Sequence, residues 1–93
     1  TETTFYILLA LNEPGHGYFI MQKVEELSEG KVRIAAGTMY GAIENLLSRK
    51  LIEPFPGEDK RRKMYIITQL GKDVLRMETE RLQSLLTAAR KYI

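Results

Sequence analysis

The polar residues with the clearest chemical potential lie in the stretch AAGTMYGAIENLLSRK, in the middle of the chain. Thr38 and Tyr40 supply hydroxyl groups, and Asn45 carries an amide that can form a bidentate pair with adenine. Gly37 and Gly41 lie close by, although a glycine inside a helix costs about 1 kcal/mol relative to alanine. Small residues at a helix start let backbone N–H groups approach a phosphate, which the helix dipole attracts. This combination is typical of a helix that contacts DNA.

Basic residues gather directly after this stretch. Between Arg49 and Lys63 there are six basic and three acidic residues, a net charge of +3, whereas the whole chain carries +2. The four consecutive basic residues are Lys60, Arg61, Arg62 and Lys63. Such a run is either a solvated loop tip or a contact to DNA phosphates, and the run alone leaves both readings open.

Alternation along a strand predicts how the basic residues divide between two faces. Arg61 and Lys63 should share one face, with Tyr65 continuing it. Arg62 and Met64 should share the other. Because Met64 is apolar, we expect its face to pack on the core and the opposite face to meet DNA.

The apolar pattern predicts the elements that position these residues. The expected order is helices over residues 5–11, 18–30 and 36–49, strands over 51–55 and 63–68, and a long helix over 69–93. This order predicts an α+β, mostly helical fold, a winged helix-turn-helix with three helices, a two-stranded wing and a long C-terminal helix. In such a fold the third helix lies in the major groove, and the wing contacts the backbone or the adjacent minor groove.

Helical spacing also predicts the core. The core stripes are expected to comprise Ile20, Val24 and Leu27 on the second helix, and Met39, Ile43, Leu46 and Leu47 on the third. Tyr18 is expected in the core, and His16 is expected to cap or brace its turn. Gly30 is expected at the position just past the second helix, and Thr68 as the N-cap of the last one.

The last helix carries an apolar seam that approaches a heptad pattern. Its members are Leu75, Leu82, Leu86, Ala89 and Ile93. The seam either packs on its own chain or joins two subunits. A chain of this size has a thin core, which favours the second interpretation. We therefore expect residues 1–68 to form the DNA-binding part and residues 69–93 a dimerisation helix.

Composition excludes several classes of protein. The chain has no cysteine and one histidine, so cysteine nucleophiles, thiolate zinc sites and paired-histidine metal sites are excluded, and no cofactor or metal is expected. No histidine accompanies a nucleophile at a recognisable spacing, which argues against an enzyme. The longest apolar run, Phe5–Leu11, is too short to span a bilayer, so we expect a cytoplasmic protein without a membrane partner.

Three motifs resemble the N-terminal winged-helix domain of the PadR-like transcriptional regulators. They are GHGY before the second helix, GTMY at the start of the third, and RRKMYIITQLGK from the wing into the last helix. Together with their flanks they cover about two thirds of the chain. The resemblance implies a regulator, most often a repressor, that binds a palindromic operator as a homodimer. A winged helix that binds another protein instead of DNA is the alternative.

Two departures from the family pattern affect the site. Ala35 and Ala36 stand where the family usually has a Ser-Pro pair, which removes a capping hydroxyl. Lys50 stands where the family usually has glycine. Some short members bind small aromatic effectors at the dimer centre through tryptophan. This chain has no tryptophan, so Phe5 or Tyr92 would have to substitute.

Overall fold

The computed structural model describes residues 1–57 and 62–93, and contains helices and one antiparallel hairpin. The elements are α1 (Glu2–Ala10), α2 (Gly17–Leu27), α3 (Ala36–Ser48), β1 (Ile52–Phe55), β2 (Met64–Ile67) and α4 (Gln69–Ala89). This order confirms the predicted mostly helical α+β architecture. The first helix differs in its bounds, because it begins at Glu2 where Thr1 accepts a hydrogen bond from the Thr4 N–H.

The helix starts follow from local chemistry. His16 caps α2, its Nδ1 accepting from the Phe19 N–H at 3.2 Å, as expected for this residue. Thr68 caps α4 and accepts from the Gly71 N–H at 3.0 Å. Ala35 precedes α3 without a side-chain cap, which agrees with its missing hydroxyl.

Two helix ends use left-handed residues that are not glycine. Past α2, Glu29 adopts φ 54° and Gly30 φ 79°, so the first position beyond the cap belongs to Glu29 and the prediction for Gly30 is off by one residue. Past α3, Lys50 adopts φ 63°. The Lys50 N–H donates to the Leu47 carbonyl and the Leu51 N–H to the Leu46 carbonyl, the paired bonds of a Schellman motif.

The core lies between the three N-terminal helices and the base of the hairpin. Its largest fully buried side chains are Ile7, Leu11, Ile20, Val24, Met39, Ile43, Leu46 and Ile52. The predicted stripe on α3 is confirmed for its first three members, and Leu47 packs against the core as a half-buried residue. Two predictions are wrong. Tyr18 is 66% exposed, on the side of α2 opposite Ile20 and Val24. Leu27 is 40% exposed, as the last residue of the helix.

The hairpin pairs Ile52 with Ile67 and Phe55 with Met64. Its core face carries Tyr65 and Ile67, whereas Met64 is only half-buried. The prediction that Met64 marks the core face was therefore wrong. The reason is tertiary: Tyr65 and Ile67 pack into the buried core cluster with residues of the three helices. In the plane of the sheet, the Gly15 N–H donates to the Tyr65 carbonyl, and the Tyr65 N–H donates to the Gly15 carbonyl. These two hydrogen bonds join β2 to the chain just before α2.

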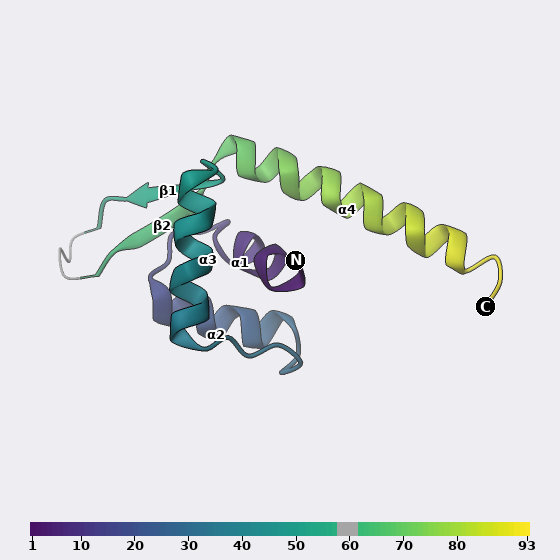
Figure 1. Ribbon diagram of the computed structural model, residues 1–93, viewed down its shortest axis with the longest axis horizontal. Coiled ribbons are helices and arrows are strands. Elements are labelled where there is room, and N and C mark those ends of the chain that lie inside the picture. Colours follow the sequence, from purple (N-terminus) through teal and green to yellow (C-terminus); the bar gives the residue numbers. More distant parts are fainter. Residues whose placement is uncertain (58–61) are drawn as a thin grey trace.

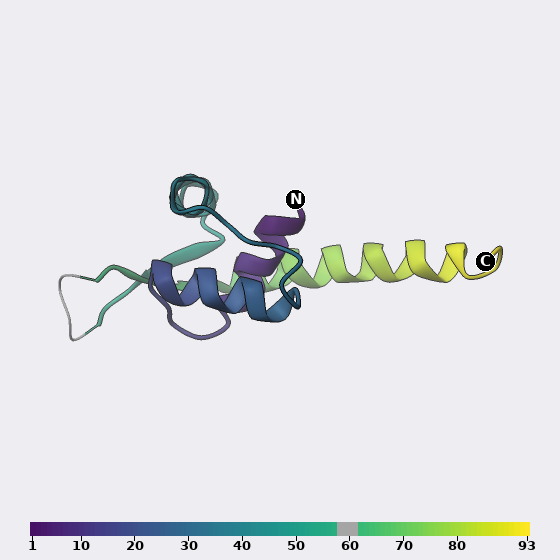
Figure 2. The same cartoon turned by 90° about the horizontal axis from the view of Figure 1, so that it is seen from below.

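The wing and the free end of α4 extend in opposite directions (Figure 1). The view in Figure 2 shows α3 end-on at one side of the molecule and α4 running out past the other helices. Only the first half of α4 packs on α1 and β2, and the dimensions of 52 × 27 × 19 Å reflect the projecting second half. Within the described residues, no helix is both long enough and apolar enough to cross a bilayer.

Candidate nucleic-acid interface

The outer face of α3 carries every residue predicted there to contact DNA. These residues are Gly37, Thr38, Tyr40, Gly41, Asn45 and Arg49, and all are exposed. The opposite face buries Met39, Ile43 and Leu46 against the core. Burial of that face fixes the rotation of α3, so its polar face and its glycines turn outward together.

The two glycines of α3 have no role within the fold. A Cβ built on Gly37 or Gly41 would meet no atom within 4 Å, and neither residue has a positive φ. By contrast, a Cβ on Gly17 would lie 2.8 Å from Met39 Cε and 3.1 Å from the Tyr40 hydroxyl. Gly17 therefore lies where α2 and α3 approach closely, and a side chain there would displace the end of Met39, whereas Gly37 and Gly41 face open space.

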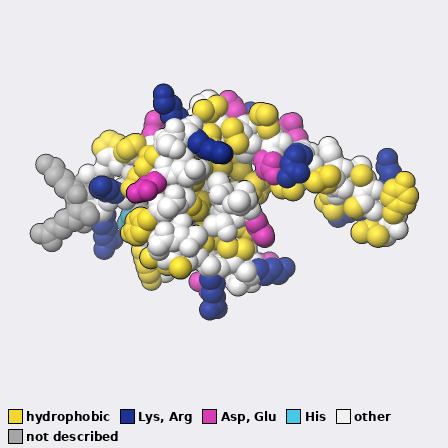
Figure 3. All heavy atoms as spheres, viewed as in Figure 1, with side chains coloured by type: hydrophobic (Ala, Val, Ile, Leu, Met, Phe, Trp, Pro, Cys, Tyr) yellow, Lys and Arg dark blue, Asp and Glu magenta, His cyan; other side chains and the backbone are white. Residues whose placement is uncertain are grey.

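The wing adds positive charge beside this face. Arg62 and Lys63 are exposed, and Lys60 and Arg61 lie outside the described residues. The predicted pairing of Arg61 with Lys63 therefore has no structural outcome. Basic side chains in this region lie close to the only histidine of the chain, seen in cyan in Figure 3. Neither Arg49 nor Lys63 pairs with any described carboxylate, whereas Arg33 is engaged with Glu25 at 3.2 Å.

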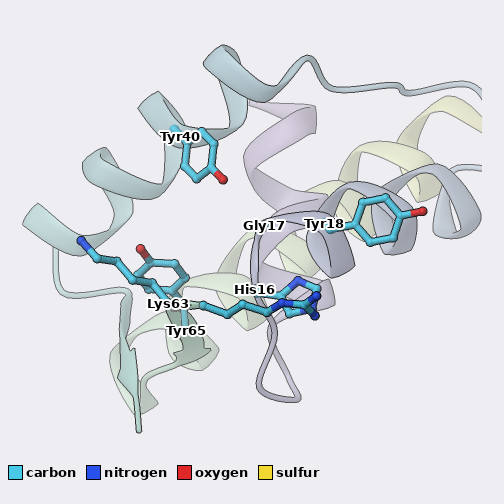
Figure 4. A pocket seen from close by; sticks show the side chains of 7 residues that line it. His16, Gly17, Tyr18, Tyr40, Lys63 and Tyr65 are labelled. Carbon is cyan, nitrogen blue, oxygen red and sulfur yellow. The ribbon is translucent and has the colours of Figure 1, made fainter. Parts of the chain in front are cut away.

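An open hollow of about 430 Å³ lies between the start of α2, the outer side of α3 and the start of β2. It is lined by His16, Gly17, Tyr18, Tyr40, Arg62, Lys63 and Tyr65. In Figure 4 the Tyr40 hydroxyl points from α3 into this space, whereas the Tyr18 hydroxyl points away from it. Within the described chain, its lining contains hydrogen-bond donors and cationic groups but no carboxylate.

The predicted dimerisation residues fall into two groups. Leu75 is half-buried and packs against the core of its own chain. Leu82, Leu86 and Ala89 are exposed along the projecting part of α4. The helix ends at Ala89 and not at Ile93 as predicted, so Ile93 is exposed beyond the helix end. Further large apolar side chains are exposed on this helix, among them Met77 and Leu85. The second half of α4 therefore presents apolar surface that the rest of the chain does not cover.

A second hollow, of about 530 Å³, lies between α1 and the middle of α4. Phe5, Tyr6 and Leu82 line it, together with Glu78 and Arg81. These last two form an ion pair in which Arg81 Nε donates to Glu78 Oε2 at 3.0 Å. This hydrogen bond lowers the pKa of Glu78 and raises the pKa of Arg81. Of the two aromatic residues expected to contact an effector, Phe5 is at this hollow, whereas Tyr92 lies beyond the end of α4.

Sequence reasoning placed Tyr65 on the strand face expected to meet DNA, but it missed the contact between His16 and Arg62, whose side-chain nitrogens Nε2 and Nη1 are 3.3 Å apart. The two residues are 46 positions apart in the sequence. The motif GHGY could have drawn attention to His16, but nothing local indicated which wing residue would lie beside it.

Comparisons with known proteins identify the family of the chain. The Transcriptional regulator PadR-like family matches residues 7–77. A 37.1 kDa protein in transposon TN4556 of Streptomyces fradiae is 31% identical over 78 residues, which are 83% of this chain and 22% of that protein. Protein X of Lysinibacillus sphaericus is 31% identical over 70 residues, which are 72% of this chain and 64% of that one. The chain thus spans less than two thirds of either relative.

A solved structure shows the same fold. The crystal structure of a PadR family transcription regulator from Clostridium difficile R20291 has a TM-score of 0.83 at 24% identity, and the match covers 99% of this chain and 98% of the other. Because the family match takes in well over half of the residues, the chain belongs to the PadR-like family of transcriptional regulators, whose members regulate transcription through DNA and are not enzymes.

Proposed function

We propose that this regulator is a repressor that binds a palindromic operator as a homodimer. The outer face of α3 lies in the major groove, with Thr38 and Asn45 toward base edges and Arg49 toward the backbone. The wing, with its run from Lys60 to Lys63, contacts the backbone or the adjacent minor groove. Two half-sites one helical turn apart, about 34 Å, match the twofold symmetry of such a dimer. The bound dimer represses by occupying DNA that the polymerase needs.

One observation carries this proposal: Gly37 and Gly41 face open space on the exposed side of a helix. Each costs about 1 kcal/mol of helix stability relative to alanine, and the fold obtains no close packing in return. Residues that weaken a helix without helping its packing are explained by an external surface that approaches the backbone. DNA in the major groove is such a surface, and the basic wing lies beside it.

The dimer in this proposal forms through the projecting part of α4, so that residues 1–68 bind DNA and residues 69–93 join the subunits. The exposed apolar residues there supply the contact surface. The hollow between α1 and α4 adjoins this surface and contains Phe5 and Tyr6, which suits a small aromatic effector. An effector bound there changes the packing of α4 and thereby the spacing of the two α3 helices.

The decisive experiment is an unbiased selection of DNA sequences by the purified protein. We expect a palindrome with half-sites about one helical turn apart, and binding that weakens as salt rises. A protein that enriches no sequence and shows no salt-dependent shift of any duplex is not a DNA-binding regulator. That result would favour a winged helix that binds another protein.

Gly41→Ala tests the glycine argument directly. We expect the free energy of unfolding to rise by up to about 1 kcal/mol, because alanine is the better helix former and the added methyl group meets open space. Affinity for the selected operator should fall, because the methyl group blocks the close approach to DNA. Thermal unfolding and fluorescence anisotropy measure the two effects. A more stable protein with unchanged affinity would show that Gly41 does not face DNA.

A further inference from the structure

The first hollow contains two hydrogen-bond donors that face each other. His16 Nδ1 accepts the Phe19 N–H at 3.2 Å, so the ring proton of the neutral imidazole is on Nε2. Arg62 Nη1 lies 3.3 Å from that Nε2, and a guanidinium can only donate. With this tautomer the short distance joins two N–H groups, whereas the other tautomer would let Nε2 accept from Arg62 and would leave the Phe19 N–H without its cap. An acceptor placed beside the pair, at the mouth of the hollow, would bind both.

Tyr65 supplies an independent observation. Its side chain is 9% exposed, and its hydroxyl has no hydrogen-bond partner among the described residues. Every fully buried polar side-chain atom of the described residues has a hydrogen-bond partner. Because the Tyr65 hydroxyl has no such partner, it is not fully buried and is accessible from the hollow. The two backbone hydrogen bonds to Gly15, of 3.0 and 2.9 Å, fix the strand in this position. A nearly buried tyrosine thus offers a fixed donor to the same space, where Figure 4 shows it beside Lys63, with His16 across the hollow.

The start of α2 adds backbone donors. The N–H groups of Gly17 and Tyr18 precede the first hydrogen bond inside the helix, and the helix dipole makes this end positive. The missing Cβ of Gly17 lets the Tyr40 hydroxyl lie directly above this first turn. Donors from α2, α3 and β2 therefore converge on one volume, and no described carboxylate opposes an anion there.

We propose that this hollow binds one phosphate group of the DNA backbone in each half-site. The assignment rests on the proposed function, because α3 and the wing bring DNA to the mouth of the hollow. A phosphodiester carries one negative charge and only acceptor atoms, which complements His16 Nε2–H, Arg62, Lys63 and Tyr65. The hollow is open to one side, so a phosphate that stays joined to its neighbours can enter it.

The test compares Tyr65→Phe with wild type on the selected operator and on a random duplex, at several salt concentrations. Removing one hydroxyl should weaken both complexes by roughly tenfold, since hydrogen bonds to charged groups are the strong ones. The salt dependence should stay unchanged, because no charge is removed. Asn12→Ala is the control, because Asn12 is exposed and lines neither of the two hollows. His16→Asn keeps a good N-cap but removes the donor on Nε2, and should weaken binding similarly.

Neutral methylphosphonate linkages, introduced one at a time into the operator, locate the contact. Wild type should lose affinity at one position per half-site, and Tyr65→Phe should lose much less at that same position. If Tyr65→Phe binds the operator and every other duplex as tightly as wild type does, the proposal for this hollow is wrong. The proposed function would still stand. If wild type binds no duplex, both proposals fall. In that case, titration with inorganic phosphate would test whether the hollow binds a free anion. Binding of a free anion without binding of DNA would contradict a contact to the DNA backbone.

Discussion

At the scale of single residues, the left-handed lysine after α3 is an unusual choice. Lys50 adopts φ 63° in a position where a side chain costs roughly 1 kcal/mol relative to glycine. Its backbone still completes the Schellman motif through the Lys50 and Leu51 N–H groups. The motif therefore forms in spite of the residue, because Leu51 is buried and holds the turn in place.

Lys50→Gly should stabilise the protein by about 0.5–1 kcal/mol, since glycine adopts this conformation without a Cβ penalty but has more freedom when unfolded. Chemical denaturation measures the change. The control is Lys31→Gly, an exposed lysine without a positive φ, which should bring no gain. Equal effects of the two variants would show that the gain does not come from the left-handed conformation.

Asn45 tests how α3 reads bases. It is exposed on the face opposite Ile43 and Leu46, and its side chain forms no hydrogen bond within the described chain. Asn45→Ala should weaken operator binding by about 1–3 kcal/mol for each base that the amide reads, while binding to random DNA stays nearly the same. Anisotropy titrations on both duplexes separate the two effects. An equal weakening on both duplexes would assign Asn45 to the DNA backbone.

At the scale of elements, direct hydrogen bonds and close packing join the end of α3 to the start of α4. The Thr68 hydroxyl donates to the Lys50 carbonyl at 2.7 Å and accepts the Gly71 N–H, while the Thr68 N–H donates to the Leu51 carbonyl. A Cβ on Gly71 would collide with the Leu51 carbonyl oxygen. The end of α3 and the start of α4 therefore move together.

Thr68→Val should destabilise the protein by about 1–3 kcal/mol, because it removes both a helix cap and a hydrogen bond to a helix end while keeping the side-chain shape. Thr68→Ser keeps the hydroxyl and should remain close to wild type. Thermal unfolding compares the two variants. If Thr68→Ser loses as much stability as Thr68→Val, the loss of the hydroxyl does not account for the effect.

At the scale of the whole molecule, the projecting half of α4 lacks a partner. Leu82, Leu85 and Leu86 are each more than 40% exposed on a helix that extends beyond the core. Apolar side chains grouped in this way mark a surface for association. A second copy of the chain that contributes the same helix would bury both surfaces in a symmetric dimer.

Replacing Leu82 and Leu86 by glutamate together should produce monomers or insoluble chains, because charges would then face the subunit contact. Sedimentation velocity measures the mass of the soluble species. Exchanging Gln83 for glutamate is the control, since Gln83 lies outside the predicted seam. A folded dimer of the double variant would exclude this part of α4 from the interface.

The sequence by itself determined the kinds and order of the elements. Helical spacing placed Met39, Ile43 and Leu46 in the core, and local side chains such as Thr68 and His16 mark helix starts, because these signals act over only a few residues. The outward rotation of Gly37 and Gly41 followed from the same spacing. The left-handed conformation of Lys50 could also be predicted, because the end of a helix depends on only a few neighbouring residues.

Only the tertiary structure decided which face of β2 is buried, and what surrounds the first hollow. Alternation showed that Met64 and Tyr65 face opposite sides, but not which side is the core. The packing of the helices against Tyr65 and Ile67 decided it. In the same way His16 and Arg62 meet across 46 residues of sequence. Contacts of this range depend on how α2, α3 and the wing pack together, and no local pattern of residue types encodes that packing.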